Sequence, residues 1–248
     1  MIMTCGLPRD PLVNIVLFEA SELTSDHKIT LADRRYEHLR DVLKCAEGDR
    51  VRVGMINGAK GTGQILSMTT ATVDLHVEIK DAPLPCHPAT LVLALPRPKM
   101  LRRILRSCAE FGVQDIHIIH SYRVEKSFWQ SPLLEPKKIR QALLVGLERS
   151  GDTRLPIVTL HRRFKPFIED QLAAIAREKP ILLAHPGDFP PMETTLAEPH
   201  LIMIGPEGGF IPYEVDLACE VGAQPRTLGP RILSVDTTVP AILGRTLP

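Results

Sequence analysis

Two stretches near the C-terminal end decide the fold: LIMIGPEGGF at residues 201–210 and LGPRIL at residues 228–233. In the first, a short apolar run predicts a strand buried on both faces, and glycines and a proline end it abruptly. Pro212 then predicts the first turn of a helix. A strand, a glycine turn and a helix start leave free backbone N–H groups at the edge of a sheet, where open α/β folds bind ligands.

The second stretch repeats this pattern, since an extended run at residues 224–228 ends in Gly229 and Pro230. Glycine adopts backbone angles that other residues avoid, which lets the main chain approach a ligand closely. Two glycine-terminated strands therefore predict opposite walls of one pocket. For the last helix we expect a cap at Asp236, Thr237 or Thr238, with Pro240 tolerated only in its first turn.

Composition bounds the class of protein. The chain has 248 residues and a net charge of +1, so any attraction to nucleic acid must come from local basic patches. The five cysteines are scattered and never spaced C-x-x-C, which favours a reducing cytoplasmic location without a disulfide framework. The nine histidines lack metal-ligand spacing, so we expect no metal site. The apolar run at residues 12–18 is too short to span a membrane, and we expect no membrane partner.

The sequence divides at a proline-rich linker, residues 81–88. Before it, alternating apolar and polar residues at 50–53 and 72–79 predict strands, and residues 33–43 predict one helix. This first domain, residues 13–84, is expected to be a small barrel-like β domain, a type that often binds nucleic acid.

After the linker, strands and helices alternate, which predicts an α/β domain at residues 89–248 with a mainly parallel sheet. The expected strands are 91–95, 116–119, 157–160, 181–184, 201–204 and 224–228. The expected helices are 101–111, 139–147, 167–177, one beginning at Pro212 and the last one near Asp236.

Taken alone, each glycine stretch has a purely structural alternative, because glycine turns after strands are common. The first stretch is neither a phosphate-binding loop nor a G-x-G-x-x-G fingerprint, which counts against a nucleotide-binding dehydrogenase. Glu207 would repel phosphate but would accept hydrogen bonds from a ribose, an amine or a base edge. Arg231 is open to two interpretations, a ligand contact or an ion pair with Glu207 or Asp236.

Two basic clusters also have two interpretations, a solvated helix face or contacts with RNA phosphates. One lies at the start of the second domain and the other on the helix of the first. The candidates for RNA binding are Arg34, Arg35, Arg40, Lys99, Arg102 and Arg103.

Together, the two glycine stretches resemble the signature of the RsmE-type 16S ribosomal RNA (uracil-N3) methyltransferases of the SPOUT superfamily. The resemblance extends to HLRDVLK at residues 38–44 with Gly48 and Asp49, to residues 99–113, and to residues 148–156. It therefore covers nearly the whole chain.

The resemblance implies a PUA-like RNA-binding first domain and a SPOUT domain with a C-terminal trefoil knot. It also implies a homodimer that acts on 16S ribosomal RNA or the small ribosomal subunit, and S-adenosyl-L-methionine as the cofactor. By resemblance, the cofactor would be bound by Leu183, His185, Ile204, Gly205, Glu207, Gly208, Gly209, Leu228, Gly229, Arg231, Ile232 and Leu233.

Methylation of the uracil nitrogen requires alignment of that nitrogen with the methyl group and removal of its proton. Glu207 and Asp236 are the carboxylates near the two walls, and we expect one of them to orient or deprotonate the base. Arg231 is expected to stabilise the charge that develops on the uracil carbonyl.

The chain departs from the family pattern at several positions. Ser234 stands where an arginine is usual and Asp236 where a glutamate is usual, while Arg149 and Asp152 replace a glutamine and an arginine. These departures leave open a second hypothesis, a catalytically impaired or retargeted RNA-binding relative.

Overall fold

The computed structural model describes residues 14–193 and 198–247, which divide into two compact units. One unit contains the chain up to Leu84 together with Leu147–Leu155, and the other contains Pro85–Gly146 and the chain from Pro156 onward. The sequence predicted two contiguous domains separated by the proline-rich linker. The inclusion of Leu147–Leu155 in the first unit is a difference from that prediction.

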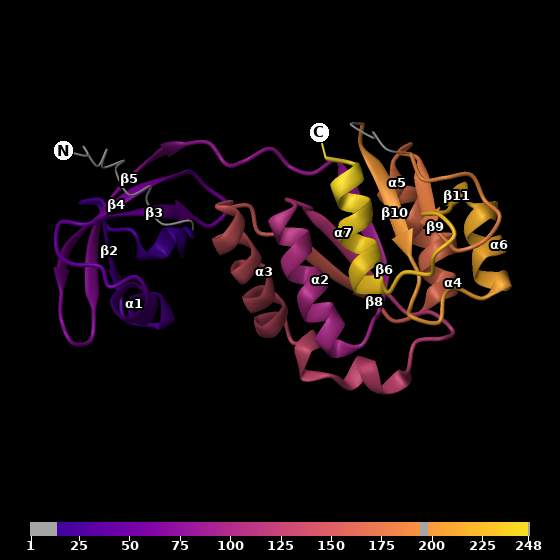
Figure 1. Ribbon diagram of the computed structural model, residues 1–248, viewed down its shortest axis with the longest axis horizontal. Helices are drawn as coiled ribbons and strands as arrows, with labels where there is room; N and C mark the ends of the chain where they lie inside the picture. Colours follow the sequence, from indigo (N-terminus) through magenta and orange to yellow (C-terminus); the bar gives the residue numbers. More distant parts are fainter. Residues whose placement is uncertain (1–13, 194–197, 248) are drawn as a thin grey trace, which may run out of the picture. The chain divides into compact units, whose positions relative to one another are not determined.

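The first unit is a five-stranded sheet in the order β1-β3-β4-β5-β2 (Figure 1). β1 pairs with β3 in parallel, and the other neighbours are antiparallel. The strands are β1 (Val16–Phe18), β2 (Lys28–Leu31), β3 (Arg50–Met55), β4 (Lys60–Met68) and β5 (Val73–Asp81). The predicted helix is present as α1 (Arg34–Glu37) followed by a π-helical segment, η2 (His38–Val42), and a short 3-10 helix, η1 (Ala20–Glu22), follows β1.

Alternation explains the core of this sheet. Val73, Leu75 and Val77 of β5 are at most 1% exposed, whereas the residues between them are only half-buried. They pack with fully buried side chains from β1, β2 and η2: Phe18, Ile29, Leu31 and Leu39. The alternating pattern thus gives one apolar face, as expected for a half-buried strand.

Residues 147–155 bind the first unit through side-chain and main-chain hydrogen bonds. The Arg34 guanidinium donates to both Glu148 carboxylate oxygens, at 3.1 and 2.5 Å. Asn57 N–H donates to the Thr153 carbonyl at 2.7 Å, and Thr153 Oγ1 donates to the Gly58 carbonyl at 2.6 Å. Asp152, a departure from the family pattern, is buried and accepts from Thr153 N–H at 2.7 Å, so it closes its own turn.

The second unit contains a six-stranded sheet in the order β11-β9-β10-β6-β7-β8, with every neighbouring pair parallel. The predicted strands are all present in it. They are β6 (Ala89–Ala94), β7 (Asp115–Ile119), β8 (Ile157–His161), β9 (Ile181–Ala184), β10 (His200–Ile204) and β11 (Ala223–Arg226). The predicted α/β class with a parallel sheet is confirmed.

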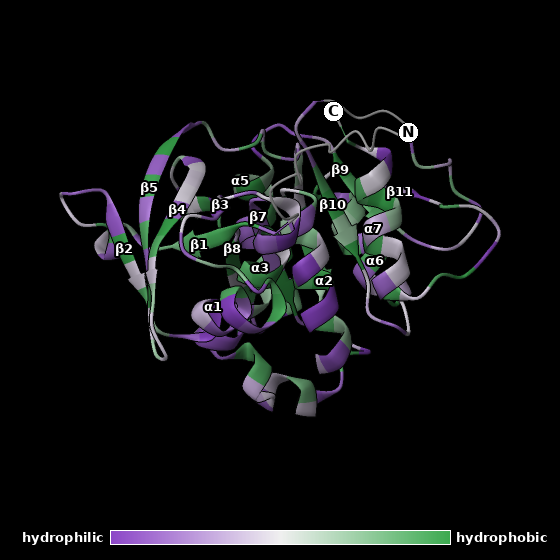
Figure 2. Ribbon diagram, turned by 60° about the vertical axis from the view of Figure 1, so that its left-hand side comes forward, coloured by the Kyte–Doolittle hydropathy of each residue, from purple (hydrophilic) through white to green (hydrophobic). Residues whose placement is uncertain are grey.

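The helices of the second unit follow the predicted alternation. They are α2 (Pro98–Glu110), α3 (Pro136–Ser150), whose last residues belong to the first unit, α4 (Phe164–Phe167), η5 (Ile168–Leu172), α5 (Ala173–Ala176), α6 (Pro212–Glu220) and α7 (Val235–Arg245). Two short 3-10 helices, η3 (Lys126–Gln130) and η4 (Pro132–Leu134), follow β7. Figure 2 shows hydrophobic residues concentrated along the central strands β9 and β10. Every residue of β10 is buried, which accounts for the apolar run that follows His200.

The start of α7 corrects two expectations. Ser234 is the residue at the N-cap, and its carbonyl accepts from Thr237 and Thr238 N–H at 3.0 and 2.8 Å. Asp236 therefore lies in the first turn rather than at the cap. Pro240 lies inside the helix, where its ring nitrogen donates no hydrogen bond to the preceding turn.

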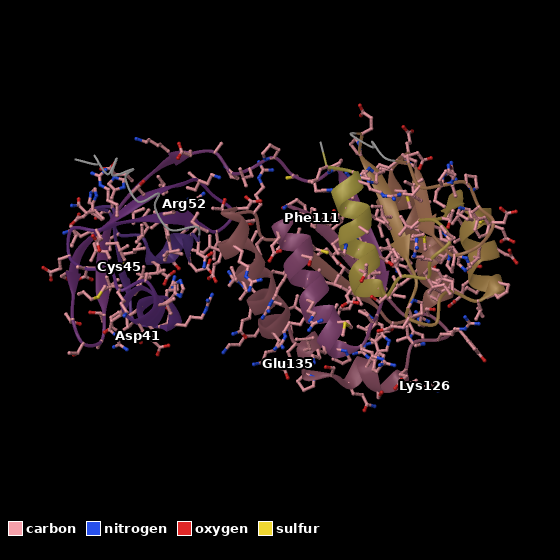
Figure 3. All side chains as sticks on the ribbon, in the orientation of Figure 1. Asp41, Cys45, Arg52, Phe111, Lys126 and Glu135 are labelled. Atoms are coloured by element: carbon pink, nitrogen blue, oxygen red, sulfur yellow. The ribbon has the colours of Figure 1, made fainter. Side chains whose placement is uncertain are left out.

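Packing compensates for that lost hydrogen bond. Val239 and Ile242 of α7 are fully buried, and the helix packs against α2 and contacts β10. Figure 3 labels Phe111, the residue at the C-terminal end of α2, and a Cβ at Gly244 would lie 3.9 Å from its ring. Tertiary contacts thus keep α7 helical through the proline.

A buried histidine fixes the end of α7. His87 Nδ1 accepts from Ala89 N–H at 3.1 Å, so Nε2 carries the proton and donates to the Leu243 carbonyl at 3.0 Å. Both nitrogens are used by the neutral ring, and a proton on Nδ1 would break the bond to Ala89. Burial lowers the pKa of His87, and it also lowers the pKa of the neighbouring His200.

We predict that acid destabilises the protein through these histidines. Because their folded-state pKa values lie below the unfolded value of about 6.5, their stabilisation is complete above that pH and is lost as pH falls through the folded-state values. The temperature of the thermal unfolding midpoint should decrease as the pH is lowered from 7.5 to 5. His87→Gln should reduce this dependence, and His27→Gln, on an exposed side chain, should leave it unchanged. An equal pH dependence in wild type and His87→Gln would contradict the assignment.

Candidate functional site

A pocket lies at the carboxyl ends of β9 and β10 in the second unit. The parallel register pairs Ile204 with Ala184, so both strands end at the same level of the sheet. The turns that follow them enclose a cavity of about 220 Å³. Its lining residues are Ala184, His185, Pro186, Ile204, Gly205, Pro206, Glu207, Gly208, Gly209, Phe210, Thr227, Leu228, Gly229, Arg231, Ile232, Leu233, Val235 and Thr238.

The structure gathers the sequence-predicted cofactor residues around this pocket, except for Leu183. Leu183 is fully buried within β9, one residue before the lining begins at Ala184. Sequence reasoning did not single out Ala184 and Pro186, nor Pro206, Phe210 and Thr227, which lie within or beside the quoted stretches. It also missed Val235 and Thr238 in the first turn of α7, whose side chains reach the pocket only because that helix packs beside β10.

The first wall of the pocket is the turn after β10. Gly209 has a φ of +73°, and its N–H donates to the Pro206 carbonyl at 2.7 Å. A Cβ on Gly205 would lie 3.1 Å from the Phe210 nitrogen and 3.2 Å from a Phe210 ring carbon. The turn therefore folds closely over the end of the strand, and a side chain at Gly205 would force it outward.

The second wall is the turn after β11. Gly229 has a φ of +112°, and Thr227 Oγ1 accepts from Gly229 N–H at 3.2 Å. His185 N–H donates to the Arg226 carbonyl at 3.0 Å, which joins this turn to the end of β9. The second wall is thus tied to the end of β9, the strand that lies between β10 and β11 in the sheet.

Unused main-chain donors lie in the second wall. Within the part of the chain that the structure describes, the N–H groups of Leu228, Ile232 and Leu233 have no hydrogen-bond acceptor. All three residues line the pocket. Backbone N–H groups need a partner when they are covered, so a ligand in the pocket would meet donors already positioned for it.

The candidate catalytic residues differ in position. Glu207 lines the pocket, and its Oε1 accepts from Arg97 N–H at 3.0 Å. Asp236 is outside the lining and lies 3.8 Å from the Arg103 guanidinium. Arg231 lines the pocket and is exposed, and it pairs with neither carboxylate among the described residues. The structure therefore brings Glu207 and Arg231 to one cavity and leaves Asp236 beside it.

The candidate RNA-binding residues of the first unit already have protein partners. Arg34 pairs with Glu148, and Arg40 donates to Asp41 and to the Tyr36 hydroxyl. Burial alone would lower the pKa of Arg35, but its hydrogen bonds to Glu22 and Asp33 raise it above the ordinary value. Arg35 therefore has a structural role in holding η1 to α1.

The basic residues of α2 have fewer protein partners than those of the first unit. Lys99, Arg102 and Arg103 are exposed on the face of the helix opposite its buried stripe, and among the described residues only Arg103 is near a carboxylate, that of Asp236. These side chains remain accessible to a ligand such as RNA.

Residues 14–193 and 198–247 contain no cluster of three or more histidine, cysteine, aspartate or glutamate side chains able to hold a metal ion. Among the helices of these same residues, none is both long enough and apolar enough to cross a membrane.

Comparison with known proteins identifies the class. A family model described as an RNA methyltransferase domain matches residues 82–247. A ribosomal RNA small subunit methyltransferase E from Treponema pallidum is 32% identical over 238 residues, covering 91% of this chain and 87% of that protein. The protein of the same name from Synechocystis is 26% identical over 237 residues, covering 92% of this chain and 76% of that one.

Solved structures share the fold. The ribosomal RNA small subunit methyltransferase E of Neisseria gonorrhoeae, solved bound to S-adenosyl methionine, has a TM-score of 0.73 at 20% identity. The alignment covers 93% of this chain and 96% of that chain. A methyltransferase from Legionella pneumophila, solved with bound SAM, also has a TM-score of 0.73, at 19% identity, covering 93% of this chain and 95% of that one.

The fold and the matching family model define an RNA methyltransferase. Within that class, the chain belongs to the RsmE-type family, the small-subunit ribosomal RNA methyltransferases E. The sequence-based assignment and the prediction of a methyltransferase that uses S-adenosylmethionine are confirmed. This membership sets aside the dehydrogenase alternative.

A matched pair of glycine substitutions tests the pocket walls. Gly229 and Gly222 have φ values of +112° and +97°, and a Cβ at either would meet nothing within 4 Å. Changing either to alanine should cost roughly 1 kcal/mol of stability through backbone strain. Only Gly229→Ala moves a pocket wall, so it alone should weaken S-adenosylmethionine binding, by tenfold or more in calorimetric titration. Equal affinities in the two variants would rule out a role for the second wall.

Proposed function

We propose that this protein methylates N3 of a uracil in 16S ribosomal RNA, with S-adenosylmethionine bound in the pocket between the two glycine walls. The observation that carries the proposal is the convergence of both walls at one edge of the parallel sheet, where three lining residues have main-chain N–H groups without an acceptor among the described residues. The names of the relatives support a small-subunit ribosomal RNA substrate. Action on ribosomal RNA implies a cytoplasmic protein.

The residues of the pocket fit the proposed cofactor. Ile204, Leu228 and Val235 offer apolar side chains to an adenine ring, and the N–H groups of Leu228, Ile232 and Leu233 suit its nitrogens or the ribose oxygens. When bound, the cofactor supplies an electrophilic methyl group on sulfur. The protein must then hold the uracil nitrogen in line with that group, which is mainly a matter of position.

Glu207 is the carboxylate best placed to act on the uracil. Its Oε1 accepts from Arg97 N–H, which fixes the side chain and leaves Oε2 to accept a hydrogen bond from the uracil N3–H. Removal of this proton as the methyl group transfers makes the nitrogen nucleophilic. Arg231, on the opposite wall, stabilises the negative charge that develops on a uracil carbonyl. We assign Asp236 to positioning of the first turn of α7 beside Arg103.

The remaining parts of the proposal concern architecture. We propose that residues 13–84 form a PUA-like RNA-binding domain and that residues 89–248, apart from Leu147–Leu155 in the first unit, form the SPOUT domain. In the second domain the chain passes from the central strand β10 to the edge strand β11, and α7 then returns to pack beside α2 and β10. This segment would contain the trefoil knot. The active form is proposed to be a homodimer.

The departures from the family pattern have structural roles that leave the pocket intact. Ser234 is at the N-cap of α7, and Asp152 closes a turn in the first unit. Neither residue lines the cavity. The missing arginine at Ser234 bears on the RNA substrate rather than on the cofactor, and it motivates the alternative of a retargeted or impaired RNA-binding relative.

The decisive assay is transfer of labelled methyl from S-adenosylmethionine to small ribosomal subunits purified from cells that lack this protein. Mass spectrometry of the digested RNA should identify 3-methyluridine at one site. A different modified nucleoside would refute the N3 assignment. Cofactor binding without transfer to a verified unmodified subunit would favour the retargeted or impaired relative.

A carboxamide substitution tests the role of Glu207. Glu207→Gln keeps the size of the side chain but removes the base, so kcat should fall by about 10²- to 10⁴-fold while cofactor affinity changes only a few-fold. Asp236→Asn is the matched control, because it weakens only a partly exposed ion pair, and it should retain most activity. Greater loss of kcat in Asp236→Asn than in Glu207→Gln would show that the two roles are reversed.

A further inference from the structure

A loop outside the two glycine walls contacts the first of them, since the Arg123 guanidinium donates to the Gly208 carbonyl. Residues 120–124 follow β7, whose Ile119 pairs with Ala94 of β6, and β6 in turn pairs with β10. Because these strands are parallel, the loop emerges at the same edge of the sheet as the pocket.

A buried carboxylate fixes the backbone of this loop. Glu214 of α6 is 3% exposed, and it accepts from Ser121 Oγ at 3.0 Å, from Tyr122 N–H at 2.8 Å and from Ile211 N–H at 3.1 Å. A buried carboxylate with three donors is strongly directional, and its loss would leave those donors unpaired. The loop is therefore held to the start of α6, immediately after the first pocket wall.

Arg123 joins the loop directly to that wall. Its guanidinium donates to the Gly208 carbonyl, and its side chain lies so close that a Cβ on Gly208 would be 3.0 Å from Arg123 Cδ. Gly208 is thus small because Arg123 crosses it. This contact places the backbone of residue 122 next to the rim of the pocket.

The backbone of Tyr122 is held by a hydrogen bond, whereas its aromatic ring is exposed to solvent. The residue is 77% exposed, and no ring contact involves it among the described residues. Aromatic side chains of this size are usually covered, and an exposed ring on a fixed backbone is suited to stacking on a nucleic-acid base. Such stacking tolerates any base, since every base offers a flat face.

Exposed cations lie in the same segment as the ring and at the end of the neighbouring strand. Arg123 and Lys126 flank it in the sequence, with Glu125 as the carboxylate of this segment, and Figure 3 labels Lys126. On the neighbouring strand end, Arg162 stacks over the Trp129 ring at 5.0 Å, and Trp129 donates to His120 Nδ1 at 2.9 Å. Exposed cations around an exposed aromatic match the phosphates and bases of single-stranded RNA.

We propose that Tyr122 is a stacking platform for an RNA base beside the target uracil, and that Arg123 positions this platform against the first wall of the pocket. The inference rests on the proposed function and adds a substrate-binding residue to it. A base that must be unstacked to reach the pocket loses its neighbours in the RNA, and an aromatic ring at the rim replaces one of them.

Three substitutions at one position test the platform. Tyr122→Ala and Tyr122→Leu should raise KM for unmodified small ribosomal subunits roughly tenfold to hundredfold, with kcat at saturation nearly unchanged. Tyr122→Phe should retain the wild-type KM, because stacking needs the ring and not the hydroxyl. S-adenosylmethionine affinity should stay at the wild-type value in all three variants. Ile157→Ala is the control, since this exposed residue begins β8 at the opposite edge of the sheet.

A binding assay separates this inference from the proposed function. Tyr122→Phe should bind a single-stranded, uridine-containing RNA oligonucleotide as tightly as wild type, and Tyr122→Ala and Tyr122→Leu should bind it more weakly. This order is expected whether or not methyl transfer occurs. A Tyr122→Leu protein that binds the oligonucleotide as tightly as wild type would overturn the platform. So would a change in oligomeric state of Tyr122→Ala by light scattering, which would assign the ring to an interface between two copies of the chain.

Discussion

The parallel register of β6, β10 and β9 is the constraint on which the rest of the site depends. Ile204 lies opposite both Ala184 and Leu93, so three neighbouring strands end at one level. Backbone that leaves the ends of parallel strands must turn, and here the turns contain glycine and proline where the main chain folds most tightly. A slip of the register would separate the two walls, since each is attached to its own strand.

Hydrogen bonds hold the loops and turns around the pocket at this edge of the sheet in place. Glu214 ties the loop after β7 to α6, Glu207 ties the first wall to the start of α2, and Thr227 closes the second wall on itself. These interactions are made by groups that are otherwise costly to leave unpaired. The pocket is consequently preformed, and a ligand need not pay the full entropy of ordering the turns.

Local pattern was sufficient for the strands and the two walls, because an apolar run ending in glycine specifies both an element and its end. Local pattern did not predict contacts between residues that are far apart in the sequence. The return of residues 147–155 to the first unit depends on Arg34 and Thr153 finding partners about a hundred positions away. Pro240 was misplaced because packing of α7 overrides the local cost of a proline. Tyr122 carried no local signal, since its exposure follows from the contacts of its neighbours.

The central claim is that main-chain groups of the second wall bind the cofactor, and amide hydrogen exchange of the intact protein with and without S-adenosylmethionine tests it most directly. The account predicts that the N–H groups of Leu228, Ile232 and Leu233, which lack acceptors within the described chain, become protected when the cofactor binds. Gly222 N–H, which already donates to the Cys219 carbonyl, should not change. Saturating cofactor without protection at the three wall positions would contradict the account.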